Sequence, residues 1–246
     1  LIPALVRQCK YSHWDEEHWA VQSLVKLLED PEETIRLAAM EELQAEVRTI
    51  PLRPVLWHAI NDPALSVRRL ACKLPVRLKF AEMQSLRGCL DATSMQSAPY
   101  RAESAIYLLI QSGQRGMRTA LGKTAESLVH DTYWLTLEGS ALEELAAGEN
   151  PPRPGARLMF KAFQEASLSV IEQIFWLMSA DSSEEEVQAV RRALPSTDPV
   201  ERANAAEALE AILPPVIARQ LAKLLDDSPV EQVIKCAKDE LDLRPP

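Results

Sequence analysis

Apolar residues recur at helical spacing along almost the whole chain, and no segment alternates between apolar and polar positions as a half-buried strand does. The first predicted helix runs through Leu24 and Leu28, and the second covers 35–43. In the turn between them, Asp30 can cap backbone N–H groups, and Pro31 fits the first helical position, where a missing N–H costs nothing. The pattern predicts an all-α protein.

The sequence pattern of the turn and of the start of the second helix recurs along the chain. Each copy places an Asp-Pro pair before a helix that carries Arg and, three positions later, Ala; the copies begin at Asp30, Asp62 and Asp198, with variants over 91–102 and 227–234. Neighbouring prolines of the series are 30 to 36 residues apart, and the interval from 99 to 199 equals about three such periods. A helical hairpin of this size cannot bury its apolar face alone, so neighbouring hairpins must stack.

The hairpin with its Asp-Pro turn and Arg-x-x-Ala start resembles the HEAT repeat, most clearly over 14–110 and 184–243. The resemblance implies an α-α superhelix, a right-handed solenoid of about six helical pairs. The chain 1–246 would form a single array, with an irregular middle (about 113–157) between the repeats of 14–110 and those of 158–243. Residues 119–145 fit one long helix or a pair broken near Gly139, and residues 148–155 are the clearest loop, which we expect to be an excursion rather than a hinge.

In the HEAT family the Asp of the turn and the Arg of the second helix commonly pair within or between repeats. Carried over by that resemblance, Asp30 with Arg36 and Asp62 with Arg68 form a ladder, whereas Asp198 and Arg202 are spaced differently. The expected ladder residues are Asp30, Arg36, Asp62, Arg68, Arg101, Asp198, Arg202 and Asn204.

A second resemblance covers about 170–226, where the most specific element is Arg-Ala-Asn-Ala-x-Glu-Ala-Leu at 202–209. It is similar to HEAT segments that follow transporter-like membrane domains in some bacterial proteins related to nucleotide translocases. It implies a water-soluble part of a longer membrane protein, an interpretation that also suits a chain beginning with Leu1. No stretch approaches the ~20 uncharged apolar residues of a membrane span.

The charge and the cysteine content limit which partners and which cellular compartment we expect for the chain. The net charge is −9; residues 1–137 are balanced, and the acidic excess lies in 138–246, which argues against nucleic acid as a partner. The four cysteines, Cys9, Cys72, Cys89 and Cys236, follow neither a disulfide nor a metal-site spacing. We therefore expect buried thiols and a reducing, cytoplasmic location, either dissolved or tethered at the cytoplasmic face of a membrane.

The chain offers little for catalysis. Gly122-Lys123-Thr124 matches the last three residues of a phosphate-binding loop motif, but the first glycine of that motif is absent. Residues 122–124 also fit a helix. Cys9 with His13 and His18 does not form a metal-ligand face, because the two histidines are five residues apart. We expect no enzyme, no catalytic residue, no cofactor and no metal.

These observations predict a non-catalytic protein-interaction scaffold that binds an unidentified protein. Trp57, Arg69 and Lys73 are the candidate partner-binding residues, although the five tryptophans are expected mainly to fill seams between repeats. The first alternative is a regulatory domain bound to the membrane domain of the same polypeptide. The others are a DNA-binding enzyme of the HEAT-like glycosylase type, with a basic patch over 68–79, and a HEAT-like tetrapyrrole lyase.

Overall fold

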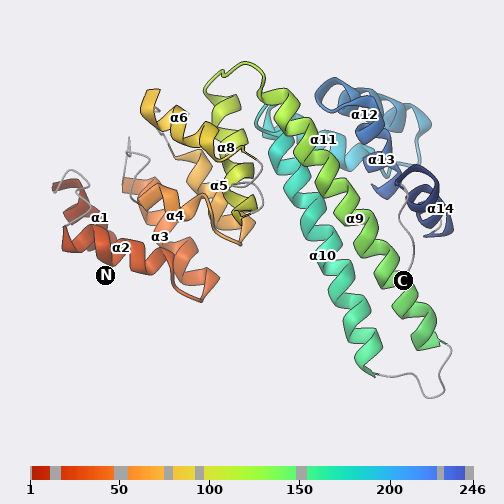
Figure 1. Ribbon diagram of the computed structural model, residues 1–246, viewed down its shortest axis with the longest axis horizontal. Helices are drawn as coiled ribbons and strands as arrows, with labels where there is room; N and C mark the ends of the chain where they lie inside the picture. The colour runs from red at the N-terminus through yellow and green to blue at the C-terminus, as the bar shows by residue number, and fades with distance from the viewer. Residues whose placement is uncertain are drawn as a thin grey trace. The chain divides into compact units, whose positions relative to one another are not determined.

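The computed structural model describes residues 2–11, 18–46, 55–74, 80–91, 97–147, 154–225 and 230–241. In these ranges the regular secondary structure is helical, without a strand, which confirms the all-α prediction for the described residues (Figure 1). The chain divides into two compact units, Leu1–Met117 (unit 1) and Arg118–Pro246 (unit 2). A single superhelical array of about six helical pairs stays a prediction.

Unit 1 consists of short helices whose order in sequence matches their order in space. They are α1 (Ile2–Tyr11), α2 (Trp19–Leu28), α3 (Glu33–Glu46), α4 (Trp57–Ala59), α5 (Leu65–Lys73), α6 (Phe80–Gly88) and α8 (Pro99–Gln111). The second helix of each predicted hairpin contacts the next one, since α3 packs against α5 and α5 against α8 (Figure 1). The first helices of neighbouring hairpins also pack against each other, since α2 contacts α4.

The core of unit 1 lies between these two layers. Leu24 of α2 and Met40 and Leu43 of α3 are completely buried, as the helical spacing predicts. Ala39 and Ala71 are also completely buried, and their small side chains let neighbouring helices approach closely.

Unit 2 consists of a long helical hairpin and four shorter helices. The hairpin is formed by α9 (Met117–Ala147) and α10 (Pro154–Met178), which run side by side in opposite directions (Figure 1). The shorter helices are α11 (Glu184–Ala193), α12 (Pro199–Ile212), α13 (Pro215–Leu225) and α14 (Val230–Leu241), each in contact with the next. Ser183 and Glu186 form a capping box at the start of α11.

The middle of the chain departs from the predicted period. Instead of about three hairpins, residues 99–199 contain α8, α11 and one hairpin with helices of 31 and 25 residues. The reason is visible in α9, which has no proline between its ends and passes through Gly139 without a break. A Cβ atom on Gly139 would lie 3.4 Å from Cβ of Phe163 on α10, so this glycine faces the other helix of the hairpin rather than ending α9. The loop expected at 148–155 lies almost wholly outside the described residues.

The tryptophans only partly fill seams. Trp176 is buried and Trp57 is half-buried, but Trp19 and Trp134 expose 58% and 44% of their surface. Trp14 lies outside the described residues. The prediction that the tryptophans fill seams between repeats is therefore wrong for Trp19 and Trp134. The spacing of apolar residues predicts which side of a helix is buried, but it does not show which residues of that side a neighbouring helix covers.

Candidate functional site

Arg36 joins two successive hairpins of unit 1. Its guanidinium donates two hydrogen bonds to the carboxylate of Asp62, from Nε at 2.7 Å and from Nη2 at 3.0 Å. Nη1 donates to the backbone carbonyls of Asp30 and Pro31 at 2.8 and 3.0 Å. The hydrogen bonds to Asp62 raise the pKa of Arg36, and burial opposes that effect. The arginine thus holds the turn before its own helix and the acidic side chain of the next turn.

Arg68 repeats this arrangement one hairpin later. Nη1 donates to the carbonyls of Asp62 and Pro63 at 2.7 and 2.9 Å, and Nη2 donates to Oε2 of Glu103 at 3.1 Å. Arg68 is completely buried and also lies over the ring of Tyr100, 4.6 Å from its centre. Burial lowers the pKa of Arg68 and raises the pKa of Glu103, and the charge of each partner opposes the shift of the other.

Glu103 is a ladder residue that the sequence analysis missed. It takes the place of a turn aspartate as the carboxylate that receives the arginine of the preceding hairpin. A signal was present in the sequence, since Glu103 is the one acidic residue of α8 and its neighbours 102 and 104–109 carry no charge and are mostly apolar. A lone carboxylate within such a run predicts a buried cationic partner.

The Asp-Pro copy of unit 2 has a different register. Asp198 is itself the N-cap of α12, accepting a hydrogen bond from Val200 N, and Pro199 is the first helical residue. In unit 1, α3 begins at Glu33, so the prediction that Pro31 is the first residue of its helix is wrong and the Asp-Pro pair belongs to the turn.

Ser196, not Asp198, corresponds to the turn aspartates of unit 1. Its hydroxyl accepts a hydrogen bond from the backbone N–H two residues later, at Asp198, as Asp30 and Asp62 do from Glu32 and Ala64. Its carbonyl accepts a hydrogen bond from Arg202, six residues later, at 3.3 Å. Because a hydroxyl replaces the carboxylate, the turn lacks the anionic acceptor that Arg36 uses in unit 1.

The candidate partner-binding residues of unit 1 lie on two helices. Trp57 belongs to α4, and the guanidinium of Arg101 on α8 lies 5.1 Å from the centre of its ring. Nε of Arg101 is buried without a hydrogen-bond partner among the described residues. Arg69 and Lys73 are four residues apart on α5, half-buried and exposed respectively. The remaining basic residues of 75–79 lie outside the described residues.

Asn204 lines a shallow groove between α11 and α12. The groove has a volume of about 440 Å³, and small side chains form much of its wall, together with Arg192 and Glu201. Asn204 is exposed, so the structure places it on the surface of α12 rather than in a chain of buried hydrogen bonds.

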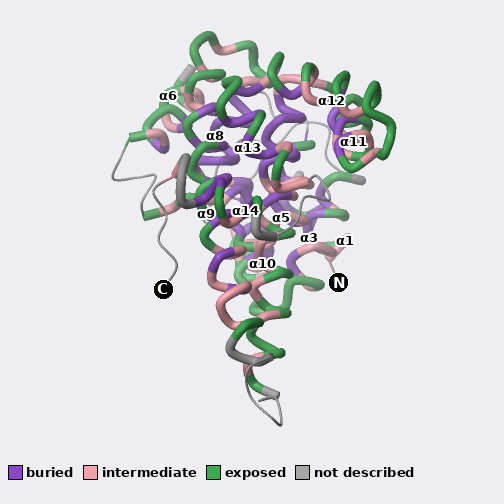
Figure 2. Tube along the Cα trace, turned by 90° about the vertical axis from the view of Figure 1, so that its right-hand side faces the viewer, coloured by how far each residue is buried: buried purple, intermediate pink, exposed green. Residues whose placement is uncertain are grey.

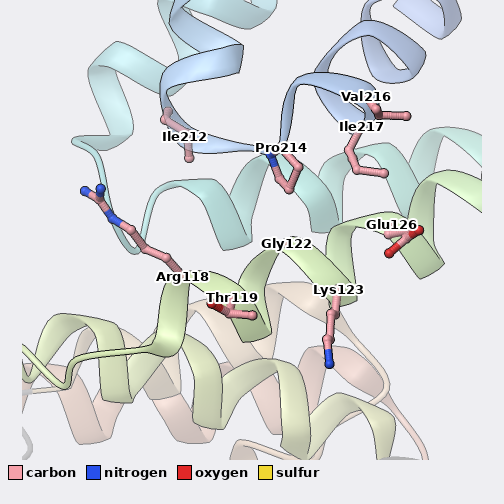
Figure 3. A pocket seen from close by; sticks show the side chains of 9 residues that line it. All are labelled: Arg118, Thr119, Gly122, Lys123, Glu126, Ile212, Pro214, Val216 and Ile217. Carbon is pink, nitrogen blue, oxygen red and sulfur yellow. The ribbon is translucent and has the colours of Figure 1, made fainter.

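A larger cleft of about 530 Å³ lies in unit 2 between the first turns of α9 and the turn from α12 to α13 (Figure 3). Gly122 faces Pro214, and a Cβ atom at Gly122 would lie 3.1 Å from Cγ of this proline. The side chains of Arg118 and Lys123 extend away from Pro214 (Figure 3), and Arg118 forms an ion pair with Asp181 at 2.8 Å. Polar groups therefore do not converge here, and residues 122–124 are helical, so they cannot cradle a phosphate as a glycine-rich loop does.

The cysteines are buried thiols, as predicted. Burial raises the pKa of Cys9 to about 11 and that of Cys72 to about 12, and it also raises the pKa of Cys89. These three thiols therefore stay protonated at neutral pH. His18 caps α2, its Nδ1 accepting a hydrogen bond from Ala20 N at 3.3 Å. The described part of the chain shows no group of three His, Cys, Asp or Glu side chains that could hold a metal ion, and His13 lies outside it.

Comparisons of the chain with protein-family models, with curated proteins and with solved structures found no match. Among the helices in the described ranges, none combines the length and the apolar character needed to cross a bilayer.

Proposed function

We propose that the chain is a non-catalytic protein-interaction scaffold of the HEAT-repeat type, whose rows of helices present a surface to a partner protein. The observation that carries this proposal is the repeated bonding of Arg36 and Arg68, each of which holds its own turn and a carboxylate of the next hairpin. Such bonding fixes neighbouring hairpins side by side, which is what an extended binding surface requires.

The chemistry of the buried polar groups supports the same proposal. Arg36, Arg68, Asp62 and Glu103 are buried in hydrogen bonds with one another or with backbone carbonyls, which makes them structural rather than reactive. The larger cleft has an apolar centre, at Gly122 and Pro214, without converging polar side chains.

The binding surface that we propose follows the second helices of unit 1, with Arg69 and Lys73 of α5 as anchors. Both residues are basic and four positions apart, so they lie on one side of α5. We infer that the bound segment carries carboxylates at matching spacing. The buried thiols agree with a partner in the reducing cytoplasm.

The test uses two lysines that occupy equivalent places on different layers. Lys73 and Lys26 are both exposed and both lie in the last turn of their helices, α5 and α2. A photoreactive side chain at position 73 of the full chain captures the partner, which is then identified and purified. We expect Lys73→Glu to weaken its binding by about tenfold or more, because a charge is reversed beside the bound segment, while Lys26→Glu leaves it unchanged.

Calorimetry with the purified partner measures both affinities. Equal losses for Lys73→Glu and Lys26→Glu would show that net charge rather than this surface governs binding. Unchanged binding by Lys73→Glu together with Arg69→Glu would remove the proposed surface.

A further inference from the structure

Three helices of unit 2 contribute polar side chains that meet at the sulfur of Cys236. Cys236 belongs to α14 and exposes 6% of its surface. Nζ of Lys223 on α13 donates a hydrogen bond to Sγ of Cys236 at 3.6 Å. The hydroxyl oxygen of Tyr133 on α9 lies 3.4 Å from the same sulfur. A thiol is therefore in direct contact with a primary amine.

The neighbouring helices hold the amine beside the sulfur. Tyr133 is completely buried, and its hydroxyl donates to the backbone carbonyl of Gln220 at 3.0 Å, which attaches α13 to α9. Gln220 and Lys223 are three residues apart, so they lie on the same side of α13. Figure 2 shows how buried and exposed residues follow one another along this helix, in which Gln220 is buried and Lys223 is exposed.

The other three cysteines do not offer this chemistry. Cys9, Cys72 and Cys89 belong to unit 1, and burial raises the pKa of each thiol, which keeps it protonated and weakly nucleophilic at neutral pH. Cys236 is the one cysteine in the sequence of unit 2, so this unit holds no second thiol that could form a disulfide with it. The nucleophile that the structure places against its sulfur is the amine of Lys223.

We propose that Cys236 and Lys223 form a cross-link in the presence of hydrogen peroxide, a covalent bond between sulfur and nitrogen that joins α14 to α13. Peroxide first transfers an oxygen atom to the thiol, which gives a sulfenic acid and water as the O–O bond breaks. The amine, after losing a proton, attacks the sulfur, and the S–O bond breaks as the hydroxyl leaves with a second amine proton as water. Overall, a thiol, an ammonium group and one peroxide molecule give a sulfenamide, two water molecules and a proton; the sulfur loses two electrons and the peroxide gains them.

The contacts around the sulfur favour both steps. As the thiol loses its proton to attack peroxide, the ammonium group of Lys223 stabilises the negative charge on the sulfur. Since Lys223 is exposed on a flexible stem, movement of its side chain gives a molecule as small as peroxide access to Cys236. For the second step, the 3.6 Å between nitrogen and sulfur is close to the ~3–3.5 Å that separates reacting atoms poised for attack.

The cross-link changes how α14 is held. In the reduced chain α14 packs against α13 without a covalent link between their side chains (Figure 1). The two bonded residues are 13 positions apart in sequence, and closing a loop of this length restricts the open state of the chain more than the folded state. Peroxide thus fixes α14 on α13, and thiol reductants release it.

The test treats the full chain with hydrogen peroxide and maps its peptides by mass spectrometry without reductant. We expect the peptides that carry Cys236 and Lys223 to be linked, with a mass two hydrogen atoms below their sum, and to separate on addition of a thiol reductant. Lys223→Arg keeps the positive charge but replaces the amine by a guanidinium that stays protonated, so we expect the linked species to fall by about tenfold or more. Lys235→Arg is the matched control, because Lys235 is also exposed and adjoins Cys236 in sequence; we expect it to leave the yield unchanged.

The helical circular dichroism of each variant establishes that it is folded. Oxidation of Cys236 to a sulfinic acid without a link, or a thiol that peroxide leaves intact, would overturn the proposal. A disulfide between Cys236 and a cysteine of unit 1 would overturn it as well. Linked peptides that persist in Lys223→Arg would show that another nitrogen reacts.

Hydrogen exchange tests whether the cross-link restrains α14. We expect the amides of α14 to exchange at least about tenfold more slowly in the peroxide-treated wild type than in the reduced chain. The Lys223→Arg chain should show no such difference after the same treatment. Equal exchange in the linked and reduced wild type would contradict the proposed restraint.

Discussion

Unit 1 and unit 2 start the second helix of a hairpin in the same way but join neighbouring hairpins differently. In both, a side-chain oxygen of the turn accepts a backbone N–H two residues later, and the turn carbonyl accepts an arginine six residues later. In unit 1 the turn residue Asp62 also receives Arg36 from the preceding hairpin. In unit 2 the corresponding residue is Ser196, and its hydroxyl instead donates to Glu201 at 2.6 Å.

The difference teaches that the local turn and the link between hairpins are separate properties of the sequence. A serine is sufficient for the turn, but the link needs a carboxylate that can accept two bonds from a guanidinium. In unit 2, other contacts join the helices: Phe175 is completely buried, and the hydroxyl of Tyr133 donates to the carbonyl of Gln220 at 3.0 Å.

The largest expected effect comes from removing the arginine in each unit. Arg68→Met leaves the carboxylate of Glu103 buried without its partner, so we expect the free energy of unfolding to fall by about 3–5 kcal/mol. Arg202→Met removes one bond to a carbonyl of a half-buried arginine, for which we expect about 1 kcal/mol or less. Urea denaturation with hydrogen exchange resolved by segment measures both; similar losses would show that the two turns are not used differently.

A second comparison uses two glycines of α9. Replacing glycine by alanine within a helix contributes about 1 kcal/mol of stability. At Gly139 the new Cβ atom would be in ordinary contact, so we expect Gly139→Ala to stabilise unit 2. At Gly122 it would lie 3.1 Å from Cγ of Pro214, and we expect overpacking of about 1–3 kcal/mol to make Gly122→Ala destabilising.

Thermal unfolding of the two alanine variants shows directly whether each substitution raises or lowers the stability of unit 2. Stabilisation by both would mean that the turn at Pro214 yields easily and that packing at this point does not restrain unit 2.

The smallest expected effect is a change with pH in unit 1. Burial raises the pKa of Glu103 above its unfolded value of about 4.3, an effect that the charge of Arg68 opposes. The stability from protonation of this carboxyl is fully present below the unfolded pKa and is lost as pH rises through the folded pKa. The wild-type chain should therefore lose stability relative to Glu103→Gln as pH rises from about 4 to neutral.

Urea denaturation of the two chains across this pH range measures the difference. A wild-type advantage that grows with pH would mean that the charge of Arg68 outweighs burial and that the pKa of Glu103 is lowered.

The sequence predicts local structure in this chain better than it predicts partners. The helices around Leu24 and Met40, the turn at Asp62 and the buried cysteines follow from spacing and residue type. The partner of Arg68 does not, because Glu103 lies 35 residues away and only the packing of α5 against α8 brings the two together.

The candidate sites show the same limit. Asp198-Pro199 matches the repeated Asp-Pro pair in residue type. The turn that corresponds to those of unit 1, however, begins two residues earlier, at Ser196. The long helix α9 was open to two interpretations, because whether Gly139 ends a helix or lies within one depends on Phe163 across the hairpin.

The most direct test of the link between hairpins is a double-mutant cycle on Arg36 and Asp62, measured by urea denaturation of the wild type, Arg36→Ala, Asp62→Ala and the double variant. The cycle removes the contribution of the Asp62 turn itself and leaves the coupling between the two side chains. Two hydrogen bonds between buried, charged partners predict a coupling of about 2 kcal/mol or more. A coupling below about 0.5 kcal/mol would contradict the account, since the hairpins of unit 1 would then be joined by packing alone.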